Sequence, residues 1–520
     1  FGAAKVSGKI GDGWSVGVLQ AFTAREDARL QLSGGDRRSI IVEPASQYAV
    51  ARLKKDFSDG RGYVGGFTSY TSRSMSGTYL ADHLPGSAML SGADFEARTP
   101  ERDWVVSGTF SMSHVSGSRA SIERLQRSSV RWYQRPDYRS QSVDPMRTNL
   151  TGTAGELSLQ KAGGQNWLGS LTYSAVSPGY EANDVGFQNR AGYRALHAVA
   201  IYRELEPERI QFFDVFLFHG RGWNPDGLLT DQVSGLGTTL EFRNQWRFNI
   251  EGFHAGASYD DRLTRGGPVA RSPRIWIGSM NLWSDRSRNL TSSFHLDRSA
   301  NEEGEWETEL AVETAFRPLT NLLISLRPAL SQEFDVDQYL ISTDDDLAAL
   351  TYGRRYVFSD IRQRMLTVSM RVNWTFSPSM TLETYLRPYI TSGDFKGYKE
   401  FAEPRTFRFD RYRDPASPSD PAGDGSGTIR QDGGRYEIDP DGDGPAAPFG
   451  FGDPDFGYAS LQGNAVFRWE YRPGSTFYLV WQLQRDEAGS TARFDPLRQG
   501  ADLFRGEATH VWLAKVSFWM

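Results

Sequence analysis

The sequence has no cysteine among its 520 residues, so it can form neither a disulfide nor a thiolate metal site. It also lacks any run of about 20 apolar residues, which a membrane-spanning helix requires. Basic and acidic residues nearly balance, at 58 and 64, which gives no basis for nucleic-acid binding. We therefore expect neither a disulfide-stabilised domain, nor a helical membrane protein, nor a nucleic-acid-binding protein.

Catalytic motifs are missing as well. The sequence contains no G-x-S-x-G, H-E-x-x-H or G-x-x-x-x-G-K-[ST] motif, and its seven histidines are scattered without the spacing of metal ligands. A hydrolase could assemble serine and histidine from distant strands, but no motif supports one. We expect that the protein is not an enzyme.

What the sequence has in abundance is alternation with a period of two. Residues 366–376 read LTVSMRVNWTF, and similar alternation recurs at 461–472, 477–484 and 509–520. The pattern is typical of strands whose two faces meet different surroundings, although an ordinary sheet packed on a core also alternates. Helical segments that could cover such a sheet are scarce. Aromatic residues gather beside short turns, as they do at the interfaces of a membrane barrel.

Short and long connections alternate along the chain. Short turns such as SPS (377–379) and RPGS (472–475) alternate with long connections, of which 394–457 is the longest. Short periplasmic turns opposite long extracellular loops describe a barrel of the bacterial outer membrane. The sequence therefore predicts an all-β protein, a transmembrane antiparallel β-barrel formed as one domain by residues 1–520, with about 22 strands and a range of roughly 20–24.

The number of strands counted from the sequence is odd. About ten hairpins and a terminal strand give roughly 21 strands, whereas single-chain bacterial barrels use even numbers. The first strand, near residues 3–10, and the last, near 510–520, both run toward the short turns. Either one strand precedes Phe1 or one is missed within 115–148. We expect the first explanation, in which an N-terminal strand or domain is absent from this chain.

Charged residues occupy the polar side of many predicted strands. In a wide barrel they would face a water-filled lumen. They could line a path for a hydrophilic solute, or pair across strands and only satisfy one another. Their mixed signs argue against a strongly ion-selective ring of one charge. The predicted lumen-facing residues are Glu309, Glu313, Arg317, Arg371, Glu383, Arg387, Arg468 and Glu470.

The sharpest local motif is D-x-D-x-D-G in the longest loop. Alternate carboxylates converge on a hard cation, and the glycine permits the sharp turn that wraps them around it. The twelfth position of an EF-hand would be Gly450, where a glutamate is required, so this is no EF-hand. The alternative is an acidic surface turn. The candidate ligands for Ca²⁺ in 439–455 are Asp439, Asp441 and Asp443, with Asp453 and Asp455 as further carboxylates that could close the shell.

Four segments carry a resemblance to a known family. They are GAAKVSGKIGDGWSVGVL (2–19), NDVGFQNR (183–190), DPDGDGPAAPFGFGDPDF (439–456) and WEYRPGSTFYLVWQ (469–482). They resemble an uncharacterised bacterial outer-membrane family whose members typically carry a family-9-type carbohydrate-binding domain before a barrel-like domain of unknown function. The resemblance implies an outer-membrane location and a link to glycans. We expect the binding domain itself to be absent from this chain.

These patterns support one leading function and two rivals. We expect an outer-membrane barrel that acts as a channel or uptake pore for a hydrophilic solute such as a saccharide, occluded by its loops or by a partner. The alternative is a non-conducting scaffold that anchors a complex on the cell surface. A TonB-dependent transporter suits the strand number but needs a plug domain. The expected partners are outer-membrane lipid, the solute and a surface or periplasmic protein, but no nucleic acid.

Overall fold

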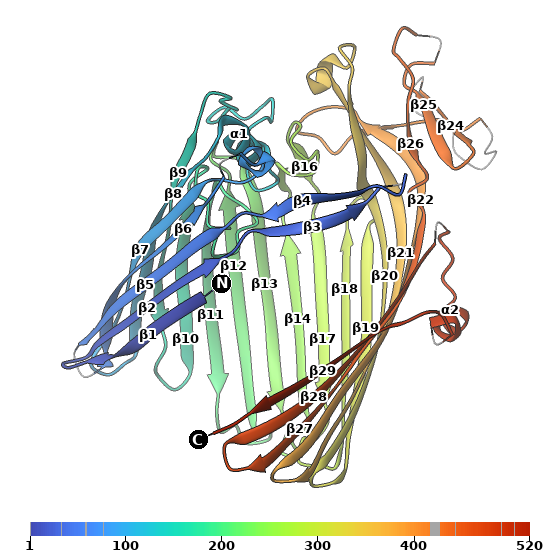
Figure 1. Ribbon diagram of the computed structural model, residues 1–520. Coiled ribbons are helices and arrows are strands. Elements are labelled where there is room, and N and C mark those ends of the chain that lie inside the picture. The colour runs from blue at the N-terminus through green and yellow to red at the C-terminus, as the bar shows by residue number, and fades with distance from the viewer. Residues whose placement is uncertain are drawn as a thin grey trace. The chain divides into compact units, whose positions relative to one another are not determined.

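The computed structural model describes residues 2–519 except 33, 58–59, 76, 416–426, 443, 490 and 504. Twenty-two strands belong to one sheet, and every pairing described within it is antiparallel (Figure 1). The described helices are α1 (Arg119–Arg127), α2 (Pro496–Leu503) and the short 3₁₀ turns Tyr79–Asp82 and Ala349–Thr351. The predicted all-β class and strand number are confirmed.

Within the described residues, no helix is long and apolar enough to cross a bilayer.

The chain forms two compact units. Unit 1 comprises Phe1–Arg203, Phe216–Ser234 and Gly256–Ser272, and unit 2 comprises Glu204–Val215, Gly235–Ala255 and Pro273–Met520. Strand alternation continues through both units without a change of composition, so the sequence alone predicts one domain.

Unit 1 contains a run of strands in which each pairs with the next along the chain. All these pairs are antiparallel, as short turns and up-and-down topology require. Two small hairpins, β3 (Glu26–Gln31) with β4 (Arg37–Glu43) and β15 (Ser258–Asp260) with β16 (Ala270–Ser272), lie in its loops. The strands of the run are β1 (Gly2–Ile10), β2 (Trp14–Thr23), β5 (Ser46–Phe57), β6 (Gly62–Arg73), β7 (Ser87–Arg98), β8 (Trp104–Ser116), β9 (Asn149–Lys161), β10 (Trp167–Val176) and β11 (Tyr193–Glu204).

Two further strands, β12 (Phe212–Trp223) and β13 (Leu229–Glu241), belong to the same sheet and contribute residues to both units.

Unit 2 contains the second run of antiparallel strands. Its three longest strands have 23, 24 and 22 residues, about twice the length that a bilayer requires of a strand, so their loop-side ends project beyond it. The strands of the run are β14 (Arg247–Ala255), β17 (Ile275–Trp283), β18 (Leu290–Asn301), β19 (Trp306–Leu319), β20 (Leu322–Asp344), β21 (Arg354–Ser377), β22 (Met380–Phe401), β27 (Phe456–Arg472), β28 (Ser475–Gly489) and β29 (Thr509–Ser517).

The longest predicted loop is partly strand. Residues 394–401 continue β22, so the connection to β27 begins later than the predicted 394–457. The charged and glycine-containing stretch DFKGYKE has no simple alternation, so the sequence alone predicts a loop there. The connection holds β23 (Phe409–Arg411), which pairs with the end of β22, and a small sheet of β24 (Thr428–Asp432), β25 (Arg435–Asp439) and β26 (Phe449–Gly452). The three-residue β23 is included in the count of 22 strands.

Pairing registers give the sheet of unit 2 two chemically different faces. We call the side that carries Ser325, Arg371 and Tyr385 the polar face, and the side that carries Leu326 and Met370 the apolar face. Directly paired residues lie on the same face, so each register extends this assignment to the next strand. Alternation in the sequence therefore becomes a continuous segregation of side chains across the sheet.

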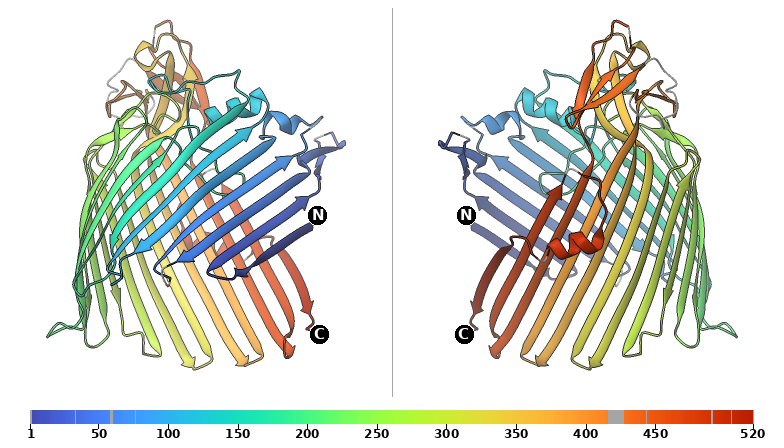
Figure 2. Two further views of the ribbon diagram at one scale, coloured as in Figure 1. Left: turned by 90° about the vertical axis from the view of Figure 1, so that its left-hand side faces the viewer. Right: turned by 90° about the vertical axis from the view of Figure 1, so that its right-hand side faces the viewer.

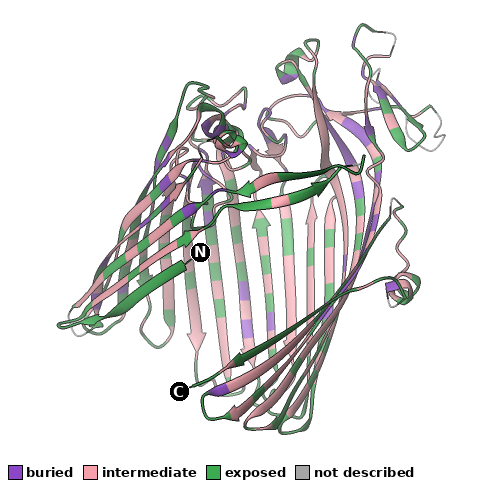
Figure 3. Ribbon diagram, in the orientation of Figure 1, coloured by how far each residue is buried: buried purple, intermediate pink, exposed green. Residues whose placement is uncertain are grey.

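Large apolar side chains are exposed on the apolar side of both units. The exposed fractions are 71% for Val6, 57% for Phe110 and 64% for Trp512. Figure 3 shows that the strands are mostly exposed or half-buried, while buried residues gather at the loop-side ends. So much exposed apolar area on one side of a sheet is costly in water and favourable in lipid.

Tryptophans mark the short-turn edge of the apolar side. Each lies at the strand end beside a short turn, at the level where amphipathic rings favour the membrane interface. These exposed tryptophans are Trp14, Trp104, Trp167, Trp246, Trp374 and Trp469.

One helix covers part of the apolar face. Leu503 of α2 is buried in a cluster with Ile390, Ala459 and Leu461 on β22 and β27, whereas Leu497 is 90% exposed. Figure 2 shows α2 lying against these strands. The helix therefore packs on the side of the sheet that bears the apolar residues.

Candidate functional site

The polar face of unit 2 brings together all eight residues predicted to line a lumen. Glu309 pairs with Ser331 of β20, which lies on the same face of that strand as Arg327. Arg371 pairs with Ser325, also of β20. The remaining members follow through the β21–β22, β22–β27 and β27–β28 registers. The sequence pattern was sufficient for this placement because period-two alternation continues across these strands.

Some of these residues neutralise one another. Glu309 lies 3.6 Å from Arg327, and Glu470 lies 2.9 Å from Arg468. The Arg371 guanidinium lies 5.0 Å from the ring centre of Tyr385. These contacts agree with the second interpretation of the sequence, in which polar residues pair with one another within the sheet.

Two others line a pocket at the short-turn end of β17–β19. The pocket measures about 260 Å³, and Glu313 and Arg317 share it with Trp283 and Arg286. Hydroxyl groups of Thr291, Ser292 and Ser293 also line it. Among the described residues, the carboxylate of Glu313 and the guanidinium of Arg317 make no ion pair. These two charges are therefore available to a ligand.

Trp283 is a pocket residue that the sequence analysis missed. It lies on the polar face because it pairs with Arg247 on β14 and with Ser293 on β18. The Arg247 guanidinium is 5.5 Å from its ring centre. An aromatic side chain on the polar side of a strand interrupts the alternation, and this interruption is the sequence feature that could have identified Trp283.

A second acidic group lies at the loop-side ends of β18–β20. Carboxylate oxygens of Glu305, Asp335 and Asp337 lie within 4.8 Å of one another, an arrangement that could hold a cation. Burial and the like charge of Asp335 raise the pKa of Glu305 to about 7. Glu305 lies in a short turn distant in sequence from the aspartates, so no local sequence motif predicts this group.

The residues of the predicted calcium loop are placed less completely. Asp443 lies outside the described residues. Asp439 Oδ1 and Asp441 Oδ1 are buried and accept no hydrogen bond within the described part of the chain, while Asp441 Oδ2 accepts one from the Ala446 amide at 3.0 Å. The described carboxylates of this loop form no group of three that could share an ion. The calcium site stays a prediction.

Buried ion pairs organise the long loops of unit 1. Arg131 and Glu181 lie 2.7 Å apart with side chains 0% and 3% exposed. Arg135 pairs with Asp261 at 2.8 Å, and also donates to the Asp261 backbone carbonyl. These contacts connect the loop after α1 to two later loops, because charges this deeply buried require partners. The loops are thus packed structures with their own cores, such as that of Val115, Ile122 and Leu150.

The family model for the domain of unknown function DUF5916 matches residues 1–407. The chain belongs to this family. No curated protein matches the sequence of this DUF5916 domain.

Several solved structures show some similarity to this chain. They include the FpvAI–pyocin S2 complex (10% identity, 90% of this chain and 73% of that chain, TM-score 0.39). The ferric enterobactin receptor PfeA of Pseudomonas aeruginosa follows (9%, 91% and 76%, TM-score 0.37). The siderophore receptor PirA of Acinetobacter baumannii is a third (7%, 98% and 74%, TM-score 0.38).

The fold class of the DUF5916 domain is that of bacterial outer-membrane β-barrels. Long antiparallel strands with exposed apolar residues on one side, polar residues on the other and tryptophans beside short turns are the features of this class. The protein is located in the bacterial outer membrane.

The acidic group at Glu305 predicts a pH-dependent stability. Because its pKa is raised from 4.5 to about 7 in the folded protein, the folded state holds a proton that the unfolded state loses. Stability from this group is fully present below the unfolded pKa and is lost as the pH rises through the folded pKa. The urea concentration at the midpoint of unfolding should decrease as the pH rises from 4.5 to about 7. The decrease should be less steep in Glu305→Gln. Identical slopes in the two proteins would contradict the assignment.

Proposed function

We propose that the DUF5916 domain conducts a hydrophilic solute across the outer membrane along its polar face. Unpaired charges carry this proposal, because Glu313 and Arg317 line a pocket with no ion pair to each other or to another described residue. Charges kept only for structure would be satisfied within the sheet, as Arg468 and Glu470 are at 2.9 Å. The polar face therefore presents binding groups to water.

We further propose a saccharide as the solute class. The pocket offers an indole ring for the apolar face of a sugar, a carboxylate and a guanidinium for its hydroxyls, and serine and threonine hydroxyls beside them. This combination of one aromatic ring with convergent polar groups is typical of sites for polyhydroxylated ligands. The family resemblance to glycan-associated proteins is in agreement with this class.

Ion selectivity tests the conduction path. Glu313→Lys replaces a negative charge in the path by a positive one and should lower the ratio of cation to anion permeability, measured as a reversal potential across planar bilayers in a salt gradient. Arg317→Glu should shift it in the opposite direction. Glu303→Lys, an exposed residue in the β18–β19 turn, serves as the control and should leave it unchanged.

The same experiment separates conduction from the scaffold alternative. If the loops block the path, a variant in which residues 403–454 are replaced by a short linker should conduct. No conductance from either protein, at a protein concentration that yields folded insertions, would contradict the pore and favour the scaffold. Maltose added to an open channel should reduce its current, and the reduction should weaken in Trp283→Ala.

Calcium binding by the loop after β25 is a second proposal. It is supported by the two buried carboxylate oxygens of Asp439 and Asp441 that have no described donor, since such atoms favour a cation. Replacing Asp439, Asp441 and Asp443 by asparagine should weaken Ca²⁺ binding by about tenfold or more in calorimetric titration. Asp432→Asn at the end of the neighbouring strand β24 is the control. Equal binding by the triple variant and the unmodified protein would remove the site.

A further inference from the structure

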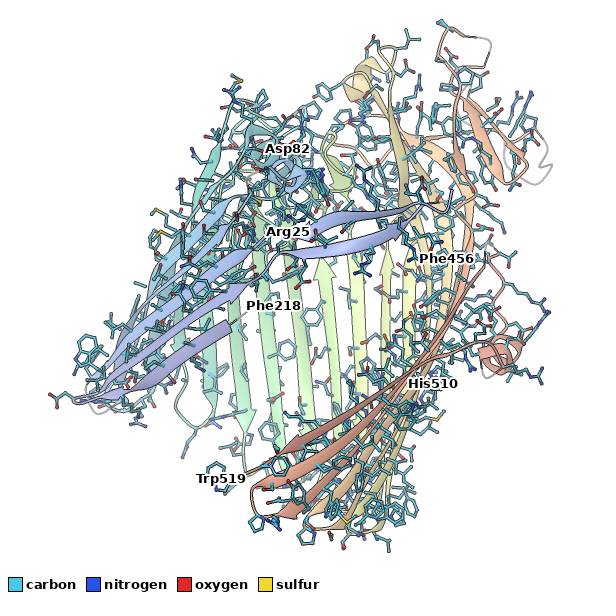
Figure 4. The ribbon with its side chains drawn as sticks, in the orientation of Figure 1. Arg25, Asp82, Phe218, Phe456, His510 and Trp519 are labelled. Atoms are coloured by element: carbon cyan, nitrogen blue, oxygen red, sulfur yellow. The ribbon has the colours of Figure 1, made fainter. Side chains whose placement is uncertain are left out.

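The loop-side end of unit 2 contains a cavity separate from the polar-face pocket. It measures about 520 Å³ and lies between the end of β22 and the β24–β25 hairpin. Phe456, labelled in Figure 4, lies at the start of β27 beside this region, with its ring centre 6.3 Å from that of Phe395. The residues on which its chemistry depends are Asp394, Phe395, Tyr398, Tyr436, Asp453 and Asp455.

A β-bulge in β22 shapes the cavity. Asp360 pairs with Lys396 but Phe358 pairs with Lys399, so β22 holds one residue more than β21 over this stretch. Gly397 has a φ of +61°, and a Cβ there would lie 2.4 Å from Nη1 of Arg411. A regular strand presents alternate residues to one side, whereas here the five consecutive residues 394–398 line one cavity.

Aromatic rings form a fixed wall. The ring centres of Tyr398 and Tyr436 lie 4.6 Å apart, and Tyr436 stacks on Phe451 at 5.5 Å. Tyr398 and Phe451 belong to the buried core that includes Val357 and Ile438. The wall is therefore positioned by packing before any ligand binds.

The carboxylates are held in place by neutral donors. Asp455 Oδ1 accepts a hydrogen bond from the Phe395 amide at 2.8 Å, and the Asp455 amide donates to Asp453 Oδ1 at 3.1 Å. Gln431 Nε2 donates to Asp453 Oδ2 at 3.1 Å. Within the described ranges, neither Asp453 nor Asp455 forms an ion pair, whereas Asp394 pairs with Lys396 at 2.7 Å.

The cavity therefore carries surplus negative charge. Two carboxylates that line it, those of Asp453 and Asp455, have no cationic partner among the described residues. Burial and the like charges of Asp453 and Asp394 raise the pKa of Asp455, as expected where carboxylates crowd without compensation.

We propose that this cavity binds a hydrophilic ligand through an alkylammonium or guanidinium group, which Asp453 and Asp455 hold beside Tyr398 and Tyr436. A cation gains charge-assisted hydrogen bonds from carboxylates and an electrostatic attraction to aromatic rings. A neutral polyol would leave the surplus charge uncompensated. A metal ion would need three converging ligands, and Asp453 and Asp455 belong to no such group among the described residues.

This binding site is independent of the proposed conduction path. It lies on the loop side of β22, outside the pocket of Glu313 and Arg317, and its test is an equilibrium binding measurement instead of a current. A protein that conducts nothing could still bind the cation, so the two proposals fail separately.

The test uses the full chain in detergent and a pair of matched probes. Calorimetric titration with cadaverine, a diamine, should show binding, while pentanediol, of the same length but neutral, should show none. Replacing both Asp453 and Asp455 by asparagine keeps the acceptor oxygens for Phe395 and Gln431 but removes the charge. This variant should bind cadaverine at least about tenfold more weakly, and Asp432→Asn should bind it as the unmodified protein does.

A second variant keeps the test decisive if the double replacement does not fold. Gln431→Lys places an ammonium group at an exposed position on the cavity wall and should also weaken cadaverine binding, while both carboxylates remain. Equal binding of the two probes, no binding of cadaverine, or unchanged affinity in both variants would overturn the proposal. Ca²⁺ binding that depends on Asp453 and Asp455, without competition from cadaverine, would overturn it in favour of a metal site.

Discussion

Backbone hydrogen bonding between neighbouring strands is the constraint on which the rest of this structure depends. In lipid there is no water to satisfy an amide or a carbonyl, so each strand must pair with its neighbours along its membrane-spanning length. Continuous registers, such as those of β5 with β6 and β8 with β9, meet this requirement. Once pairing is fixed, side chains have only two directions, and period-two alternation in the sequence decides what each face contains.

The separation of faces divides the roles of the molecule. The apolar face contributes stability through contact with lipid, and the polar face is free to carry charge without being buried in a core. Specific chemistry is built where the alternation is broken, at Trp283 on the polar face and at the Gly397 bulge in β22. The long loops add packed cores and buried ion pairs such as Arg131 with Glu181, which a membrane strand could not accommodate on its lipid side.

Much of this could be predicted from the sequence, for a physical reason. Alternation and turn length are local properties, so the fold class, the ten or so short turns and the faces of Glu309 or Arg387 followed from them. The cavity at Tyr398 and the group at Glu305 could not be predicted, because they join residues distant in sequence through a bulge and a loop. The sequence alone predicts a loop at the end of β22, because the bulge there interrupts the alternation.

The central claim is that neighbouring residues of one strand meet lipid and water in turn. Thr109 and Phe110 of β8 test it directly, because Thr109 pairs with Asp94 and Glu156 on the polar side, whereas Phe110 is 57% exposed on the apolar side. The chain has no cysteine, so single replacements Thr109→Cys and Phe110→Cys can be labelled in vesicles without background. The account predicts that a charged, water-soluble maleimide modifies the cysteine at 109 quickly and the one at 110 slowly. It also predicts that brominated lipids quench a fluorophore attached at 110 but not one attached at 109. Equal labelling and equal quenching at the two positions would contradict it.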